Sequence, residues 1–212
     1  MKIILSGIEK DLIKSWNKFC SDLDFVEVRE CSILDVECDA VVSPANSFGF
    51  MDGGIDYVYS QFFGWHVQER LKYLIQTEHH GELLVGQSEI VNTDHPKIPY
   101  LISSPTMRVP TILKDSVNPY LATRGTLLLV KNGVFKEGSL KGKLISNTVE
   151  TIAFPGLGTG VGDVHPDICA LQMRIAFEDV ILDKREFPNR WIDVQTQHQL
   201  LYRNFIKDLQ KN

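Results

Sequence analysis

Hydrophobic and polar positions alternate along this chain with two different periods. Short apolar runs predict six strands, over residues 2–5, 25–28, 39–43, 86–92, 98–103 and 149–154. Apolar residues at helical spacing predict four longer helices, over residues 9–20, 55–76, 118–132 and 166–181. Strands that alternate with helices indicate βαβ units, so we expect a three-layer α/β/α sandwich around a mixed, mainly parallel sheet.

The chain shows no linker, repeat or low-complexity stretch that would divide it. We therefore expect a single domain over residues 1–212, a length that allows a full hydrophobic core. Residues 184–212 contain FPNRW and then a further helical stretch. We expect them to form a C-terminal helical extension packed on the domain.

Composition narrows the class of protein. Hydrophobic residues make up 43% and charged residues 23% of the chain, as in ordinary globular proteins. The net charge of −5 argues against general nucleic-acid binding, which needs a clustered basic face. No apolar run approaches the roughly 20 residues that span a bilayer, and the start MKIILSG is too short for a signal peptide. We expect a cytoplasmic protein without membrane contact.

The four cysteines lack metal-binding spacing, and we predict neither a metal nor a cofactor.

The turn after the last predicted strand, PGLGTGVGD at residues 155–163, has a glycine at every second position. This is neither the Rossmann spacing nor a P-loop. Alternating glycines permit close backbone approach and turn successive N–H groups toward an anion. The helix that opens near Pro166 adds its positive dipole end. The alternative is a tight turn that binds no ligand.

A second turn, SPANSFGFMDGGID at residues 43–56, follows the buried strand over residues 39–43. Asn46 offers a donor and an acceptor, which suits sugar hydroxyls. Gly53 and Gly54 allow close approach of a ligand, and Asp56 falls in the first turn of the next helix. A helix-terminal acid without further function is the alternative for Asp56. Both turns follow strands at the edge of the sheet where ligands bind in α/β proteins.

Two histidine positions have competing interpretations. His79 and His80 lie near a predicted helix end, where a solvated pair is favoured over a metal site. His165 stands beside the second glycine turn and is a candidate for the border of the ligand site, although a purely structural role is favoured.

With both turns in view, the chain resembles the macro domain family of ADP-ribose-binding modules. Residues 43–46 occupy the position of the family's Asn-Ala-Ala-Asn, and residues 53–56 that of its glycine run and acid. The stretch from Phe154 to Pro166 matches the second family signature, a strand followed by a Gly-Thr-Gly turn and a proline-started helix. The resemblance implies that residues 156–162 hold a diphosphate. It also implies that Asn46 binds the distal ribose and that Asp56 acts on water beside the anomeric carbon.

By this resemblance the catalytic residues are Asp56 and Asn46. The remaining ligand-binding residues that it implies are Ser32, Ile33, Ala45, Phe48, Gly53, Gly54, Ile55, Gly156, Leu157, Gly158, Thr159, Gly160, Val161 and Gly162.

The chain also departs from the family pattern. Ser43 replaces the first asparagine, and the stretch Cys31-Ser32-Ile33 lacks the family's adenine-contacting aspartate, for which Asp35 is a nearby candidate. An aromatic residue of the second loop is replaced by Gly162, so Phe48 or Phe50 is expected to pack on the ribose. The usual last strand is not evident after residue 180.

We expect a protein that binds ADP-ribose or an ADP-ribosylated macromolecule and hydrolyses an ADP-ribosyl linkage to protein, nucleic acid or an acetyl ester. The alternatives are a reader that binds ADP-ribose without turnover, a phosphatase acting on ADP-ribose 1″-phosphate, and an interaction protein that binds no nucleotide.

Overall fold

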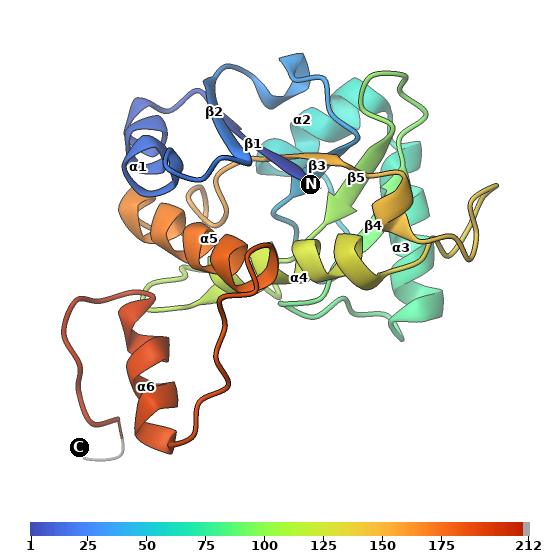
Figure 1. Ribbon diagram of the computed structural model, residues 1–212. Coiled ribbons are helices and arrows are strands. Elements are labelled where there is room, and N and C mark those ends of the chain that lie inside the picture. The colour runs from blue at the N-terminus through green and yellow to red at the C-terminus, as the bar shows by residue number, and fades with distance from the viewer. Residues whose placement is uncertain (210–212) are drawn as a thin grey trace.

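A six-stranded sheet lies between two layers of helices in the computed structural model, which describes residues 1–209 (Figure 1). The strand order is β2-β1-β6-β3-β5-β4, and only the β4–β5 pair is antiparallel. The strands are β1 (Lys2–Gly7), β2 (Val26–Glu30), β3 (Ala40–Ser43), β4 (Glu89–Asn92), β5 (Tyr100–Ser103) and β6 (Thr151–Phe154). The predicted three-layer α/β/α class with a mainly parallel sheet is confirmed.

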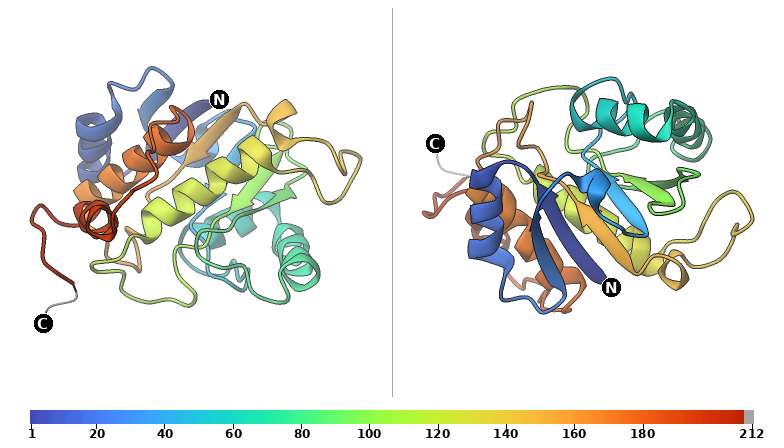
Figure 2. Two further views of the ribbon diagram at one scale, coloured as in Figure 1. Left: turned by 60° about the horizontal axis from the view of Figure 1, so that its bottom comes forward. Right: turned by 90° about the horizontal axis from the view of Figure 1, so that it is seen from above.

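Helices cover both faces of this sheet. They are α1 (Lys10–Cys20), α2 (Gly54–Phe63), α3 (His66–Glu78), α4 (Asn118–Asn132), α5 (Pro166–Val180) and α6 (Trp191–Leu200), with single 3₁₀ turns η1 (Ile33–Asp35) and η2 (Ile145–Asn147). Helices α1, α4 and α5 lie on one face, and α2 and α3 lie on the other (Figure 2). Within residues 1–209, no helix is long and apolar enough to cross a membrane.

The alternation of side chains along the strands builds one core on each face of the sheet. On β1, Ile3 and Leu5 face the core shared with α1, α4 and α5, whereas Ile4 faces the core shared with α2 and α3. Trp16 of α1 is fully buried in the first core. Strand β3 is buried along its whole length, as a central strand covered on both faces must be.

The region predicted as one helix over residues 55–76 is two helices, so that prediction was wrong. Helix α2 ends at Phe63 and α3 begins at His66. Gly64 between them has a φ of 102°, which glycine adopts readily and other residues rarely do. The apolar spacing continues across the break because both helices pack on the same face of the sheet.

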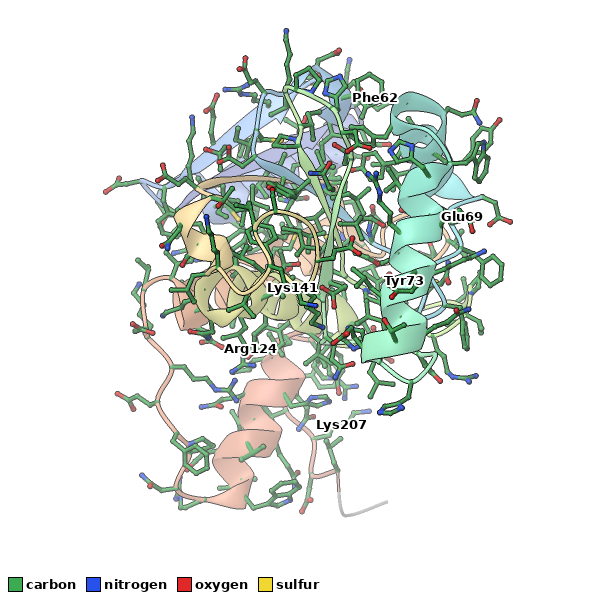
Figure 3. The ribbon with its side chains drawn as sticks, turned by 90° about the vertical axis from the view of Figure 1, so that its right-hand side faces the viewer. Phe62, Glu69, Tyr73, Arg124, Lys141 and Lys207 are labelled. Atoms are coloured by element: carbon green, nitrogen blue, oxygen red, sulfur yellow. The ribbon has the colours of Figure 1, made fainter. Side chains whose placement is uncertain are left out.

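The chain after α5 contains α6 in place of a last strand, and α6 is set apart from the sheet (Figures 1 and 3). Leu201, just past α6, packs with Tyr120 and Ala176 of the helical layer. The expected extension spans residues 184–212, of which 210–212 lie outside the described residues. Its assignment as part of a single domain stays a prediction.

Candidate functional site

A cleft with a volume of about 510 Å³ lies at the carboxyl ends of the parallel strands. The loops that line it follow β1, β2, β3, β5 and β6, so five strands contribute to one site. In α/β folds this edge of the sheet carries the ligand site. The two glycine-containing turns singled out in the sequence lie in this cleft together.

The loop after β6 lines the cleft and carries backbone N–H groups that are not hydrogen-bonded. Among the described residues, the N–H groups of residues 158–162 find no acceptor. The left-handed φ of 72° at Gly158 turns the chain, and Leu113 N–H donates to the Gly162 carbonyl at 2.8 Å. Successive unpaired N–H groups in such a turn form a concavity that suits an anion.

Close packing explains two of the glycines in this loop. A Cβ at Gly162 would lie 2.5 Å from the Gly158 carbonyl oxygen. One at Gly156 would lie 2.5 Å from Thr159 Oγ1 and 2.7 Å from Leu12 Cδ2. Gly160 differs, because a Cβ there would meet nothing within 4 Å.

Of the two helices that follow the glycine-containing turns, α2 and not α5 starts at the cleft. The first turn of α5 is already satisfied, since His165 Nδ1 accepts from Asp167 N–H and Asp167 pairs with Lys18 at 2.7 Å. Neither His165 nor Pro166 lines the cleft. By contrast, α2 has no side-chain cap, and its N-terminal Gly53 and Gly54 line the cleft. Its positive end is therefore available to an anionic ligand.

Asp56 lies in the first turn of α2 with its carboxyl at the floor of the cleft. It is 7% exposed, and its Oδ1 accepts a hydrogen bond from Ser43 Oγ at the end of β3. Burial raises the pKa of Asp56 to about 7, the Ser43 hydrogen bond opposes that rise, and the charge of Asp52 adds to it. A carboxyl that titrates near neutral pH is suited to exchange protons with a bound water or substrate.

Asn46 holds the shape of the loop after β3. Its Oδ1 accepts from the N–H groups of Phe48 at 3.1 Å and Phe50 at 3.3 Å, and its Nδ2 donates to the Phe50 carbonyl at 2.7 Å. Asn46 lines the cleft, and its second Nδ2 hydrogen has no acceptor among the described residues. The Asn46 side chain thus mainly stabilises the conformation of the loop, and one N–H group of its amide remains free to donate to a ligand.

Met51 anchors the far end of the same loop. Its N–H donates to Gln68 Oε1 at 2.9 Å, and its carbonyl accepts from Ser60 Oγ at 2.8 Å. Tyr59 Oη donates to the Val42 carbonyl at 3.1 Å, tying α2 to β3. These buried contacts fix the position of the first turn of α2 and therefore of Asp56.

The charges on the cleft wall are all acidic. Glu9, Asp52 and Asp56 line the cleft, and no lysine, arginine or histidine of residues 1–209 does so. An anionic ligand would have to be held by backbone N–H groups and the α2 dipole.

Most of the predicted ligand-binding residues meet in this cleft. Those that line it are Ser32, Ile33, Ala45, Asn46, Gly53, Gly54, Ile55, Asp56, Gly156, Gly158, Thr159, Gly160, Val161 and Gly162. Two lie elsewhere. The Leu157 side chain is fully buried in the core and does not line the cleft. Phe48 lies under the Arg108 guanidinium, and Phe50 lines the cleft in its place.

Sequence reasoning missed two parts of the cleft wall. The end of β1, the loop that follows it and the first turn of α1 contribute Ser6, Gly7, Ile8, Glu9 and Leu12, and the loop after β5 contributes Thr106, Met107 and Pro110. Both loops follow parallel strands at the predicted ligand edge. The strand-end rule would have found them, although neither carries a conspicuous motif.

Two further predictions need correction. His79 is not solvated, because it is 12% exposed and its Nε2 lies 2.8 Å from Oε2 of the buried Glu89, which also pairs with Lys136. Asp35 does not line the cleft and instead lines a separate hollow with Phe62.

Comparison with known proteins places the chain in a family. The family model for the macro domain matches residues 42–173, more than half of the chain. An uncharacterized protein of Aquifex aeolicus (strain VF5) is 28% identical over 148 residues, covering 70% of this chain and 78% of that protein.

Solved macrodomains share the fold. The macrodomain of Mycobacterium tuberculosis DarG superposes with a TM-score of 0.55 at 16% identity, covering 70% of this chain and 87% of its own. A macrodomain of Oceanobacillus iheyensis, solved with ADPR, gives a TM-score of 0.54 at 17% identity and covers 94% of this chain and 92% of its own. The chain belongs to the macro domain family.

Proposed function

We propose that this protein binds ADP-ribose in the cleft and hydrolyses an ADP-ribosyl linkage of a modified macromolecule or acetyl ester. The observation that carries the proposal is the position of Asp56. A buried carboxyl titrating near neutral pH and a run of free backbone N–H groups line the same cleft. The ADPR that accompanies a structural neighbour of the same family supports the choice of ligand.

The ligand would lie across the strand ends. Its diphosphate would accept hydrogen bonds from residues 158–162 and lie near the uncapped start of α2. The ribose that carries the modification would then lie at the loop after β3, near Asn46 and Asp56. Phe50, which is 50% exposed on the cleft wall, offers an apolar face to that sugar.

Asp56 would act as a general base. In its ionised form the carboxylate takes a proton from a water whose oxygen bonds to the anomeric carbon. The bond from that carbon to the acceptor group breaks, and the acceptor leaves with the electron pair and is protonated by solvent. Proton transfer of this kind typically contributes about 10²–10⁴-fold to the rate.

A reader without turnover is the second candidate. Asp56 is only 7% exposed and one of its oxygens is engaged by Ser43, which limits the access of water. Such a protein would need the backbone N–H groups but not the acid.

Release of ADP-ribose distinguishes the two candidates. Wild type and Asp56→Asn are incubated separately with mono-ADP-ribosylated protein, ADP-ribosylated nucleic acid, O-acetyl-ADP-ribose and ADP-ribose 1″-phosphate, and the products are quantified by mass spectrometry. We expect release by wild type from at least one substrate and its loss in Asp56→Asn. Binding of ADP-ribose without release from any substrate would instead identify a reader. Release of phosphate from ADP-ribose 1″-phosphate alone would identify a phosphatase.

A further inference from the structure

Helix α2 carries large apolar side chains on both of its faces. Its buried face includes Tyr59 and Phe63, which pack in the core beneath the helix. Its opposite face carries Tyr57, Val58 and Phe62, which are 47%, 45% and 42% exposed. A helix with apolar residues all round is ordinarily covered on every side. The exposed face of α2 therefore has the composition of a contact surface.

Trp65, just beyond α2, extends this face. It is 43% exposed, and its ring centroid lies 6.3 Å from that of Tyr57. Between these two aromatic residues the remaining exposed polar residue is Gln61, so this face of the helix carries no charge. We refer to Tyr57, Val58, Phe62 and Trp65 as the α2 surface. Exposed apolar side chains gathered in one place mark interaction sites on proteins.

The α2 surface continues into the reactive end of the cleft. Val58 lines the cleft, together with Phe50 from the loop after β3 and with Asp56 one turn of α2 earlier. In the proposed reaction the acceptor group is attached to the anomeric carbon beside Asp56. The molecule that carries the ADP-ribose therefore leaves the cleft at this end and meets the α2 surface. This step rests on the proposed function.

Two acids flank the α2 surface. Asp52 lines the cleft just before α2, and Glu69 follows Trp65 by one helical turn on α3. Both are exposed, and neither forms an ion pair within the described part of the chain. Carboxylates beside aromatic rings attract lysine and arginine, which pair with the acid and gain from the ring face. The rim of the α2 surface therefore complements a basic segment of a partner.

The lysine and arginine side chains near this surface are already engaged. Arg70 Nη1 lies 2.8 Å from Asp94 Oδ2, and Lys72 Nζ lies over the ring of Phe50, 3.9 Å from its centroid. Lys97 lies in a hollow that it shares with two acids. A nucleic acid needs a clustered basic face for its phosphates, whereas exposed tyrosine, tryptophan and phenylalanine are typical of protein–protein interfaces. The α2 surface thus favours a polypeptide.

We propose that the ADP-ribosylated substrate is a protein, and that the α2 surface binds a segment of it that carries apolar residues flanked by lysine or arginine. The apolar side chains would cover Tyr57, Phe62 and Trp65, and the basic ones would pair with Asp52 and Glu69. Large aromatic anchors carry most of the binding energy of such contacts, so loss of one should weaken binding by about tenfold.

Calorimetry with conjugates of ADP-ribose tests this surface. ADP-ribose is coupled at its anomeric carbon, through a stable aminooxy linker, to one of three carriers. These are a peptide of leucines and lysines, the same peptide with glutamates in place of the lysines, and a single-stranded oligonucleotide. Each conjugate and free ADP-ribose are titrated into wild type, Trp65→Ala and Trp191→Ala. Trp191 is exposed on α6, outside the cleft, so its variant controls for loss of an exposed tryptophan (Figure 1).

We expect wild type and Trp191→Ala to bind the leucine–lysine conjugate about tenfold more tightly than free ADP-ribose. Trp65→Ala should reduce this gain to within about threefold. Its affinity for free ADP-ribose should stay at the wild-type value, because Trp65 does not line the cleft. The glutamate and oligonucleotide conjugates should gain less than about threefold over free ADP-ribose.

The outcomes separate this inference from the proposed function. Thermal unfolding first confirms that each variant is folded. If free ADP-ribose binds but the leucine–lysine conjugate gains nothing, or keeps its gain in Trp65→Ala, the α2 surface is wrong while the proposed ligand stands. An equal or larger gain for the glutamate or oligonucleotide conjugate would contradict the basic polypeptide. If wild type binds neither free ADP-ribose nor any conjugate, both proposals are wrong.

Sedimentation of the same variants tests the other occupant of this surface, a second copy of the chain. We expect wild type and Trp65→Ala to show the same oligomeric state. A wild-type dimer that Trp65→Ala converts to a monomer would show that the α2 surface is covered by another copy and would overturn the inference.

Discussion

The two loops that face each other across the cleft are built in opposite ways. The loop between β3 and α2 is held by side chains. The Asn46 amide hydrogen-bonds the loop backbone, and Gln68 accepts from the Met51 N–H. The acid Asp56 lies just beyond the loop, in the first turn of α2. The loop between β6 and α5 depends on its backbone, with unpaired N–H groups and glycines that leave no room for a Cβ at two positions.

This difference assigns catalysis to the side chains of the loop after β3 and binding of the diphosphate to the backbone of the loop after β6. Replacing a side chain in the first loop should remove reactivity or specificity while the fold persists. Adding a side chain to the second loop should disturb the fold and the binding together. The following predictions test that division, from the largest expected effect to the smallest.

Asp56→Asn should reduce hydrolysis by about 10²–10⁴-fold, because the amide cannot take a proton from water. The variant keeps an oxygen that can accept from Ser43, so binding of ADP-ribose should change by less than about threefold. Turnover is measured by product release and binding by calorimetry. An equal loss of both would show that Asp56 serves to bind the ligand and not to catalyse.

The stability of the protein should depend on pH through the same group. The pKa of Asp56 is about 7 in the folded protein and near 3.8 in the unfolded chain, so the folded state retains a proton that the unfolded state has lost. The contribution of Asp56 to the free energy of unfolding therefore falls as pH rises from about 4 to about 7. Hydrolysis should rise over the upper part of that range as the carboxylate ionises.

Urea unfolding of wild type and Asp56→Asn at several pH values measures this effect. The stability of the variant relative to wild type should grow by about 4 kcal/mol between pH ~4 and pH ~8. Asp35→Asn, at an exposed acid outside the cleft, is the matched control and should show no such trend. A difference independent of pH would mean that Asp56 is ionised throughout.

Gly162→Ala should cost about 1–3 kcal/mol of stability, because the new Cβ would lie 2.5 Å from the Gly158 carbonyl oxygen. Gly160→Ala, where the Cβ meets nothing within 4 Å, should cost less than about 1 kcal/mol. Urea unfolding of the two variants compares them directly. Equal losses would show that this loop is not closely packed in solution.

Salt should have little effect on binding of ADP-ribose. The cleft wall has no basic side chain among the described residues, so the diphosphate would have no attraction to a lysine, arginine or histidine that salt could screen. Raising NaCl from about 50 to about 500 mM should weaken binding by less than about twofold. A tenfold loss would indicate that a lysine or arginine reaches the ligand.

The sequence was sufficient to predict the sheet and both loops. The fully apolar run ending at Ser43 could only be a buried strand, and the glycine spacing at residues 156–162 fitted a backbone site at a strand end. Helical periodicity predicted a single helix over residues 55–76 and missed the break at Gly64. A glycine within a helical pattern does not reveal its φ.

Side-chain partners were harder to predict. The local sequence does not show that Asn46 Oδ1 accepts hydrogen bonds from the N–H groups of Phe48 and Phe50. It also does not show that His79 contacts the buried Glu89. These contacts join segments through the tertiary fold. Glu9 was missed for a related reason, because its loop has no motif and enters the site only through the strand order.

Titration of wild-type protein with ADP-ribose by calorimetry tests the central claim most directly. The account predicts saturable binding at one site with a Kd below about 100 μM. It also predicts competition by ADP, which shares the diphosphate and the base. No detectable binding at about 1 mM ligand would contradict it.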